Sequence, residues 1–320
     1  MTAFVDPHSF AALSPDGEAL VSPTGTRYPI INHIPRFCEA ENYASNFGKQ
    51  WNIFDTTQID GVGVKDNISE RRFFAETGWS PEQLAGQDIL EVGSGAGRFS
   101  RVLLERTTAN LYSVDYSSAV DANWNLNGGI APGRFRLAQA SIYDMPFPDD
   151  RFDKVLCLGV LQHTPDFEAS IRALVAKARP GAEIVVDFYP VRGWWTKVHA
   201  KYLLRPWTRR MDHDRLLQLI DRNADWMIKA SNAMTRLGLG FLTRFLPLVD
   251  QRTLPNSMSK AERRETTLLD TFDMFSPQFD NPQRIAAVAA MFERANAEVR
   301  FAGYVDAIGQ AAVVRACKRI

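Results

Sequence analysis

Three glycines occupy alternate positions directly behind an apolar run, in the stretch DILEVGSGAGRFS at residues 88–100. A strand that leads into a glycine-rich turn at a helix N-terminus exposes backbone N–H groups and lets a ligand approach the chain closely. Such a trio can equally serve packing, but Asp115 ends the next apolar run, 22 residues after Gly93. A carboxylate at that position can accept hydrogen bonds from both ribose hydroxyls of a nucleoside. The pattern therefore predicts a nucleoside cofactor.

Two kinds of nucleoside cofactor bind glycine turns like this one. The dinucleotide fingerprint G-x-G-x-x-G/A needs a small residue at its sixth position, where this chain has Arg98. The spacing that starts at Gly93 is G-x-G-x-G instead, which disfavours NAD(P). A nicotinamide-dependent oxidoreductase stays open as an alternative.

The composition is that of an ordinary globular protein of 320 residues, with 45% hydrophobic and 23% charged residues. The 37 basic and 37 acidic residues cancel, so no overall charge would recruit nucleic acid, which we do not expect as a partner. Cys38, Cys157 and Cys317 lie too far apart for a metal centre or a disulfide framework. No apolar run approaches the roughly 18 residues that span a bilayer, and no leader pattern opens the chain. We therefore expect a cytoplasmic protein without a metal.

Apolar runs alternate with amphipathic segments between Asp88 and Asp187, which predicts a parallel sheet with helices on both faces. The later runs AEVRFAGYV and QAAVVRACK are separated so briefly that they must pair antiparallel. Phe47, Trp51 and Phe54 recur at helical spacing before the sheet, and we interpret them as core anchors. The alternative is that Gln50 and Trp51 close over the cofactor site. The chain divides into a small β-hairpin appendage (1–40), a core with a helical lead-in (41–190), a helical substrate cap (191–282), and a C-terminal helix and strands that complete the core sheet (283–320).

The core region resembles the class I S-adenosylmethionine (SAM) dependent methyltransferases. Their first motif looks like EVGSGAG, and QASIYDMPF followed by RFDKV is similar to their adenine edge and fourth strand. The resemblance implies an α/β, Rossmann-like sheet of seven strands with an antiparallel last strand, and SAM as the cofactor. Ser141 stands where the family commonly has an acidic acceptor for the adenine amino group, and a hydroxyl accepts that bond more weakly. The implied cofactor-binding residues are Glu91, Gly93, Ser94, Gly95, Gly97, Asp115, Tyr116, Ser141, Ile142, Gly159 and Gln162.

The stretch LGVLQHTPD, at residues 158–166, follows the fourth core strand. In the family that this chain resembles, this loop borders the methionine end of SAM. His163 is the candidate catalytic base, and the alternative is a histidine that fixes the loop and borders the cofactor. Methyl transfer is an in-line displacement, so positioning supplies most of the catalysis, and only an acidic acceptor proton calls for a base.

Four residues outside the cofactor motifs are candidate acceptor contacts: Tyr189, Trp194, Asp270 and Asp273. Residues 191–215 carry seven Lys or Arg against two Asp, interleaved with tryptophan and tyrosine. Such a stretch suits a membrane headgroup layer or a lipid-linked acceptor, because aromatic rings and basic heads favour that layer. The alternative is an amphipathic cap whose aromatic side chains face the active site.

The sequence thus predicts a SAM-dependent methyltransferase that acts on a small-molecule, sugar or lipid-linked acceptor, with oxygen as the expected acceptor atom. An NAD(P)-dependent oxidoreductase and a catalytically silent SAM-binding partner protein are the alternatives. Peripheral membrane contact through residues 191–215 is a further expectation.

Overall fold

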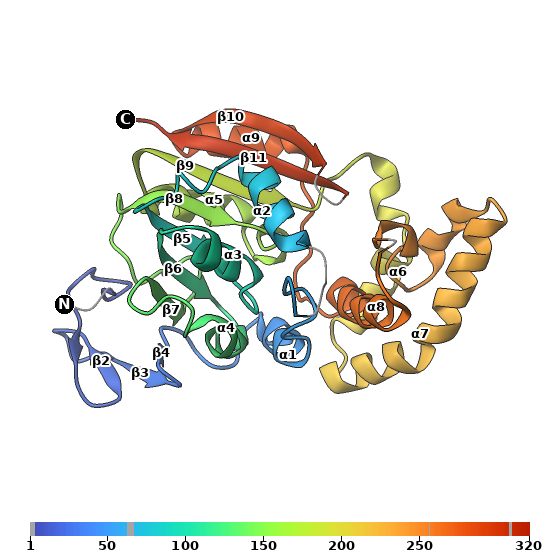
Figure 1. Cartoon of the computed structure of the whole chain (residues 1–320), viewed down its shortest axis with the longest axis horizontal. Helices are drawn as coiled ribbons and strands as arrows, with labels where there is room; N and C mark the ends of the chain where they lie inside the picture. The colour runs from blue at the N-terminus through green and yellow to red at the C-terminus, as the bar shows by residue number, and fades with distance from the viewer. Residues whose placement is uncertain (1–3, 63–66, 256, 307–308) are drawn as a thin grey trace.

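Seven strands of the described chain form one mixed sheet (Figure 1). The computed structural model describes residues 4–62, 67–255, 257–306 and 309–320. The sheet order is β10-β11-β9-β8-β5-β6-β7, and β11 runs antiparallel to both of its neighbours. This topology confirms the predicted α/β sheet with an antiparallel last strand. The strands are β5 (Asp88–Val92), β6 (Asn110–Asp115), β7 (Phe135–Gln139), β8 (Phe152–Cys157), β9 (Ala178–Phe188), β10 (Ala297–Asp306) and β11 (Gln310–Lys318).

Helices cover both faces of the sheet, because successive residues of each buried strand point to opposite sides. Leu90 and Val92 of β5 belong to the apolar cluster that includes residues of α5 (Phe167–Lys177) and α9 (Ile285–Arg294). Ile89 belongs to the cluster on the other face. That second cluster includes residues of α2 (Ile68–Thr77), α3 (Arg98–Arg106) and α4 (Ala119–Asn127).

The N-terminal appendage is a small antiparallel sheet of four short strands in the order β1-β2-β3-β4. Tyr28 and Phe37 contribute to the same apolar cluster as the sheet core, so the appendage does not rely on a core of its own. Arg36 donates to the Gln139 side chain at 3.1 Å and thereby joins the appendage to the edge strand β7. The strands are β1 (Ser14–Pro15), β2 (Ala19–Val21), β3 (Arg27–Ile31) and β4 (Ile34–Pro35).

A helical cap lies to one side of the core, with its helix α8 next to α1 (Ser45–Ile53) (Figure 1). It has its own apolar cluster, in which Leu216 and Ile220 meet Leu269 and Phe272, and Phe54 joins them from the end of α1. This cluster explains how the cap is held against the lead-in helix. The cap elements are η2 (Trp194–Lys197), α6 (Ala200–Thr208), α7 (His213–Arg236), η3 (Gly240–Phe245), η4 (Gln251–Thr253) and α8 (Lys260–Phe275).

Candidate active site

The glycine turn lies between β5 and α3, and its backbone needs glycine at each of the three alternate positions. Gly93, Gly95 and Gly97 have φ values of 79°, 53° and 86°, in the left-handed region that side chains rarely adopt. A Cβ atom on Gly93 would lie 2.2 Å from a methyl group of Val160, and one on Gly97 would lie 2.1 Å from the Asn123 side-chain oxygen. Neighbouring side chains therefore approach the backbone of the turn so closely that only glycine fits at Gly93 and Gly97.

Asp115, at the end of β6, fixes this turn. Its Oδ2 accepts a hydrogen bond from the Gly95 N–H at 2.8 Å. Its Oδ1 accepts from the Ser117 N–H at 2.8 Å and from the Ser117 hydroxyl at 2.6 Å. Burial raises the pKa of the Asp115 carboxyl, and these hydrogen bonds oppose that rise. A carboxylate oxygen has more than one lone pair, so Asp115 can still accept from a ligand.

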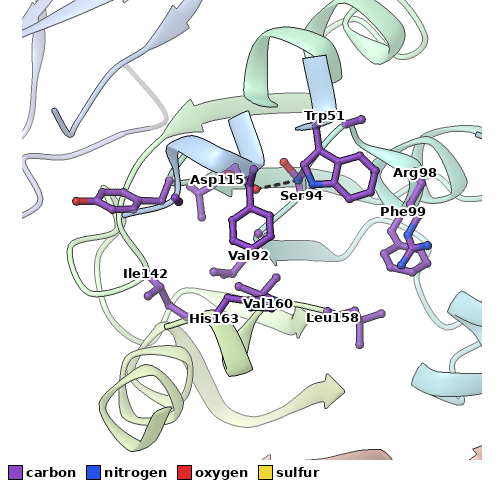
Figure 2. A pocket seen from close by; sticks show the side chains of 18 of the residues that line it. Trp51, Val92, Ser94, Arg98, Phe99, Asp115, Ile142, Leu158, Val160 and His163 are labelled. Carbon is purple, nitrogen blue, oxygen red and sulfur yellow. Dashed lines mark hydrogen bonds between the residues drawn. The ribbon is translucent and has the colours of Figure 1, made fainter. Parts of the chain in front are cut away.

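A cavity opens directly above the turn, with about 1000 Å³ of empty space that includes its mouth. It reaches from the C-terminal ends of β5, β6 and β8 to side chains of α1 and α8, and Figure 2 shows Trp51 lying over the turn beside Ser94. Open sheets of this kind bind ligands at that edge. The lining includes nine residues singled out from the sequence: Gly93, Ser94, Gly95, Asp115, Tyr116, Ile142, Gly159, His163 and Asp273.

Other candidates from the sequence lie behind the lining. Glu91 is buried under the turn, where its carboxylate accepts from the hydroxyls of Ser100 and Ser113. Burial raises the pKa of Glu91 to about 7, against these two hydrogen bonds. Gly97 precedes α3 as its N-cap residue, and the Ser141 hydroxyl accepts from the Tyr143 N–H at 3.1 Å.

The remaining candidates differ in how far the structure places them. Gln162 is fully buried, and both atoms of its amide group have no hydrogen-bond partner among the described residues. Asp270 lies on α8 one turn before Asp273. Burial and the Asp273 charge raise the pKa of Asp270 to about 7, while Arg98 and Arg72 lower it. The side chain of Trp194 lies outside the described part of the chain.

Three candidate residues from separate elements meet where the core faces the cap. The Tyr189 hydroxyl donates to Asp273 Oδ2 at 2.8 Å. The ring of His163, which ends the short helix η1 (Leu161–His163), lies edge-on to the Tyr189 ring at 5.6 Å. Burial lowers the pKa of His163 and raises that of Tyr189, and the Asp273 charge raises the pKa of both groups. His163 and Tyr189 are therefore both uncharged near neutral pH.

A second strand-end carboxylate holds the loop after β8. Asp187 accepts a hydrogen bond from the Gly159 N–H through Oδ1 and one from Arg72 through Oδ2. Arg72 also donates to Glu76 at 2.6 Å, so one half-buried guanidinium compensates two buried carboxylates. Asp187 is thus a positioning residue for Gly159, as Asp115 is for Gly95.

The sequence analysis interpreted three aromatic side chains of the lead-in helix as core anchors. Phe54 is buried in the cap cluster, and Trp51 packs against that cluster. Phe47 and Trp51 also line the cavity, which the interpretation as core anchors did not include. Arg98 also lines the cavity. In the sequence analysis this residue served only as an argument against a dinucleotide cofactor. Its guanidinium donates to Gln58 at 2.6 Å and lies 4.4 Å from the Phe99 ring centre. Burial and neighbouring Arg72 lower the pKa of Arg98 to about 9.

Comparison with known proteins agrees with this geometry. Residues 90–186 match the family model described as a methyltransferase domain. The chain carries a class I methyltransferase domain. SAM is the cofactor of that family.

The relatives of this methyltransferase domain differ in what they act on. The chain is 27% identical over 110 residues to a tRNA U34 carboxymethyltransferase of Nautilia profundicola, which covers 34% of this chain and 37% of that protein. It is 30% identical over 135 residues to a ubiquinone biosynthesis O-methyltransferase of Pseudomonas fluorescens, covering 40% of this chain and 57% of the relative. The matches therefore span less than two thirds of these curated relatives.

A solved structure shows the same fold at a lower level of sequence similarity. It is a chain from the complex that contains the Haloferax volcanii Trm112 methyltransferase activator. The likeness has a TM-score of 0.50 at 10% identity, and it covers 86% of this chain and 98% of that chain.

The cavity of the methyltransferase domain fits a nucleoside cofactor by its own chemistry. The Ser94 hydroxyl is buried and has no hydrogen-bond partner within the described residues, although Ser94 lines the cavity. A Cβ atom on Gly159 would meet no atom within 4 Å, so the chain leaves open space beside that glycine.

No group of three or more potential metal ligands occurs among the residues that the structure describes. Within the same residues, no helix has the length and apolar character needed to cross a membrane.

Proposed function

We propose that this protein transfers a methyl group from SAM to an oxygen atom of a small-molecule, sugar or lipid-linked acceptor. The observation that carries the proposal is the cavity, which brings the glycine turn into one space with side chains of α1 and α8. Methyl transfer requires that donor and acceptor share such a space in line with each other.

SAM supplies an electrophilic methyl group on a sulfonium sulfur when it is bound. The residues that would hold it are the backbone of Gly93 and Gly95, the Asp115 carboxylate for the ribose, and Ile142 beside the adenine. Asp115 accepts from the Gly95 N–H at 2.8 Å, so the turn and the ribose acceptor are positioned together. The turn is organised by the protein itself before a ligand arrives, which lowers the cost of binding.

His163 is the proposed base for the acceptor proton. Its Nδ1 lies 3.2 Å from the Phe279 carbonyl oxygen, and a neutral ring that donates there keeps Nε2 free to accept a proton. Burial lowers the pKa of His163, so the neutral form prevails at neutral pH. A residue that lines the cavity in this form can take a proton from an acceptor hydroxyl.

The wall opposite the turn supports an acceptor with an apolar portion next to a hydroxyl. Phe47 and Trp51 supply aromatic surface from α1, and Asp273 supplies a hydrogen-bond acceptor from the cap. The names of the ubiquinone O-methyltransferase relatives support oxygen as the acceptor atom. The tRNA carboxymethyltransferase makes RNA the rival acceptor class, and the experiment must include it.

The test is incubation with methyl-labelled SAM and an extract separated into lipid, RNA and small-metabolite fractions, followed by mass analysis of the labelled product. We expect label in the lipid or metabolite fraction, with the methyl group on oxygen. The Asp115→Ala variant should give much less labelled product at the same SAM concentration. Label in RNA would overturn the acceptor class, and SAM binding without label in any fraction would favour the silent binding protein.

A further inference from the structure

The cap helix α6 buries its basic side chains and exposes apolar side chains to water. Lys201 and Arg205 are buried, whereas Leu203 is 61% exposed and Trp207 is 67% exposed. Residues 203 and 207 are four apart, so they lie on the same side of the helix. Leu204 is also exposed. We call Leu203, Leu204 and Trp207 the α6 face.

The buried side of α6 is fixed by its neighbours. Lys201 Nζ lies 2.9 Å from Asp280 Oδ1. Arg205 donates to the carbonyl oxygens of Met274 at 3.1 Å and Pro277 at 2.9 Å, at the C-terminal end of α8. A helix C-terminus attracts cations because its last carbonyl groups are unpaired. These contacts hold the basic side inward, and the apolar side must then face outward.

The α6 face is not part of the cavity, since none of its three residues lines it. A second group of exposed apolar rings, Phe241 and Phe245, lies on η3. Arg244 of η3 donates to the Trp195 carbonyl oxygen at 2.6 Å, which ties η3 to the segment that precedes α6. The exposed apolar surface of the cap therefore extends beyond one helix.

The exposed charges that flank α6 along the chain are mainly basic. Lys197 precedes the helix, Arg209 and Arg210 follow it, and all three are exposed. Residues 191–211 contain no Asp or Glu, and the next acidic residues are Asp212 and Asp214 at the start of α7. A symmetric dimer through this face would bring its cations together, which disfavours a second copy as the occupant.

From this arrangement we propose that the α6 face docks on a lipid bilayer that contains anionic headgroups. Leucine and tryptophan side chains enter the boundary between headgroups and acyl chains, and flanking basic side chains meet the lipid phosphates. This inference concerns a surface outside the cavity, so it can fail while the proposed methyl transfer holds. Docking would bring the cap side of the enzyme to the layer where a lipid-linked acceptor resides.

The test is vesicle flotation of the full chain with phosphatidylcholine alone and with equal parts of phosphatidylcholine and phosphatidylglycerol. We expect binding to the mixed vesicles that weakens as salt is added. Leu203→Ser with Trp207→Ser should weaken this binding by roughly 30-fold, because two apolar side chains no longer enter the bilayer. Arg209→Gln with Arg210→Gln should weaken it by roughly five-fold for each charge removed.

The matched control is Ile31→Ser, which removes an exposed apolar side chain from the N-terminal appendage. It should leave vesicle binding unchanged, and every variant should keep the SAM affinity of the wild type. Absence of vesicle binding by the wild type would overturn the proposal, as would equal binding by the Leu203/Trp207 variant. A wild-type dimer that this variant dissociates in the absence of vesicles would instead assign the face to a second copy.

Discussion

Replacing Asp115 by alanine should weaken both the glycine turn and SAM binding. The Asp115 carboxylate accepts from the N–H groups of Gly95 and Ser117, each at 2.8 Å. Leaving a buried N–H without a partner costs about 1–3 kcal/mol. Removing a buried carboxylate returns part of its desolvation cost, since burial already raises the pKa of Asp115. We therefore expect Asp115→Ala to lower the free energy of unfolding by about 2 kcal/mol.

Asp115→Ala should reduce the favourable free energy of SAM binding by more than it lowers the free energy of unfolding. A hydrogen bond to a charged group contributes about 1.5 kcal/mol or more, and the ribose offers two hydroxyls. Losing both corresponds to about 3 kcal/mol, or roughly a 100-fold weaker Kd. Isothermal titration calorimetry with SAM measures this change, at a temperature where urea unfolding shows the variant to be folded.

Ser117→Ala is the matched control, because it disturbs the same carboxylate without facing the cavity. It removes the Ser117 hydroxyl, which donates to Asp115 at 2.6 Å and accepts from the Ala119 N–H at 3.2 Å. We expect a stability loss of about 1 kcal/mol and a SAM Kd within about three-fold of the wild type. An equal loss of SAM affinity in both variants would refute the ribose role of Asp115, as would an unchanged SAM affinity in Asp115→Ala.

Three further predictions test the groups around the cavity. Glu91→Gln should match the wild type in stability at acidic pH and be about 2–3 kcal/mol more stable at pH 8. The reason is that the pKa of Glu91 is about 7 in the folded state against the ordinary 4.5, so the stability of the wild type falls as pH rises through that interval. Urea unfolding at both pH values checks this prediction, and a stability difference that does not change with pH contradicts it. Arg72→Met should lower the free energy of unfolding by about 3–5 kcal/mol, since it leaves Glu76 and Asp187 buried without their cation; a loss under about 1 kcal/mol would contradict the network. Burial lowers the pKa of His163 below its ordinary value. The rate of methyl transfer should therefore rise with pH only in the acidic range and level off by neutral pH, and His163→Asn should abolish that rise. A rate that still increases above neutral pH would exclude His163 as the base.

The cofactor half of the site could be predicted because its signals are local. The stretch RFSRVLLER gives helix α3 at Arg98–Arg106, and the glycine turn directly precedes it. Asp115 could be placed because parallel strands end at the same edge of a sheet. Each of these inferences needs only a short window of sequence and the topology of the sheet.

The rest of the site depends on contacts that no short window contains. Arg72 and Asp187 are 115 positions apart, so their ion pair has no local signature. Helical spacing gave one face for Phe47 and Trp51 but not the body that this face meets, and the face borders the cavity. The inward side of α6 is likewise decided by Asp280, which lies 79 positions after Lys201.

Two strand-end carboxylates each hold a glycine loop that lines the cavity. Asp115 accepts from Gly95, and Asp187 accepts from Gly159, so each carboxylate holds one glycine loop at the sheet edge. Asp187 is already compensated by Arg72, whereas no cation is bonded to Asp115 among the described residues. A loop held by a compensated carboxylate can keep its shape without a ligand, while an uncompensated carboxylate retains its preference for hydroxyl donors. This physical difference favours Asp115 over Asp187 as the proposed ribose acceptor, and substitution of Asp187 should act through the position of Gly159.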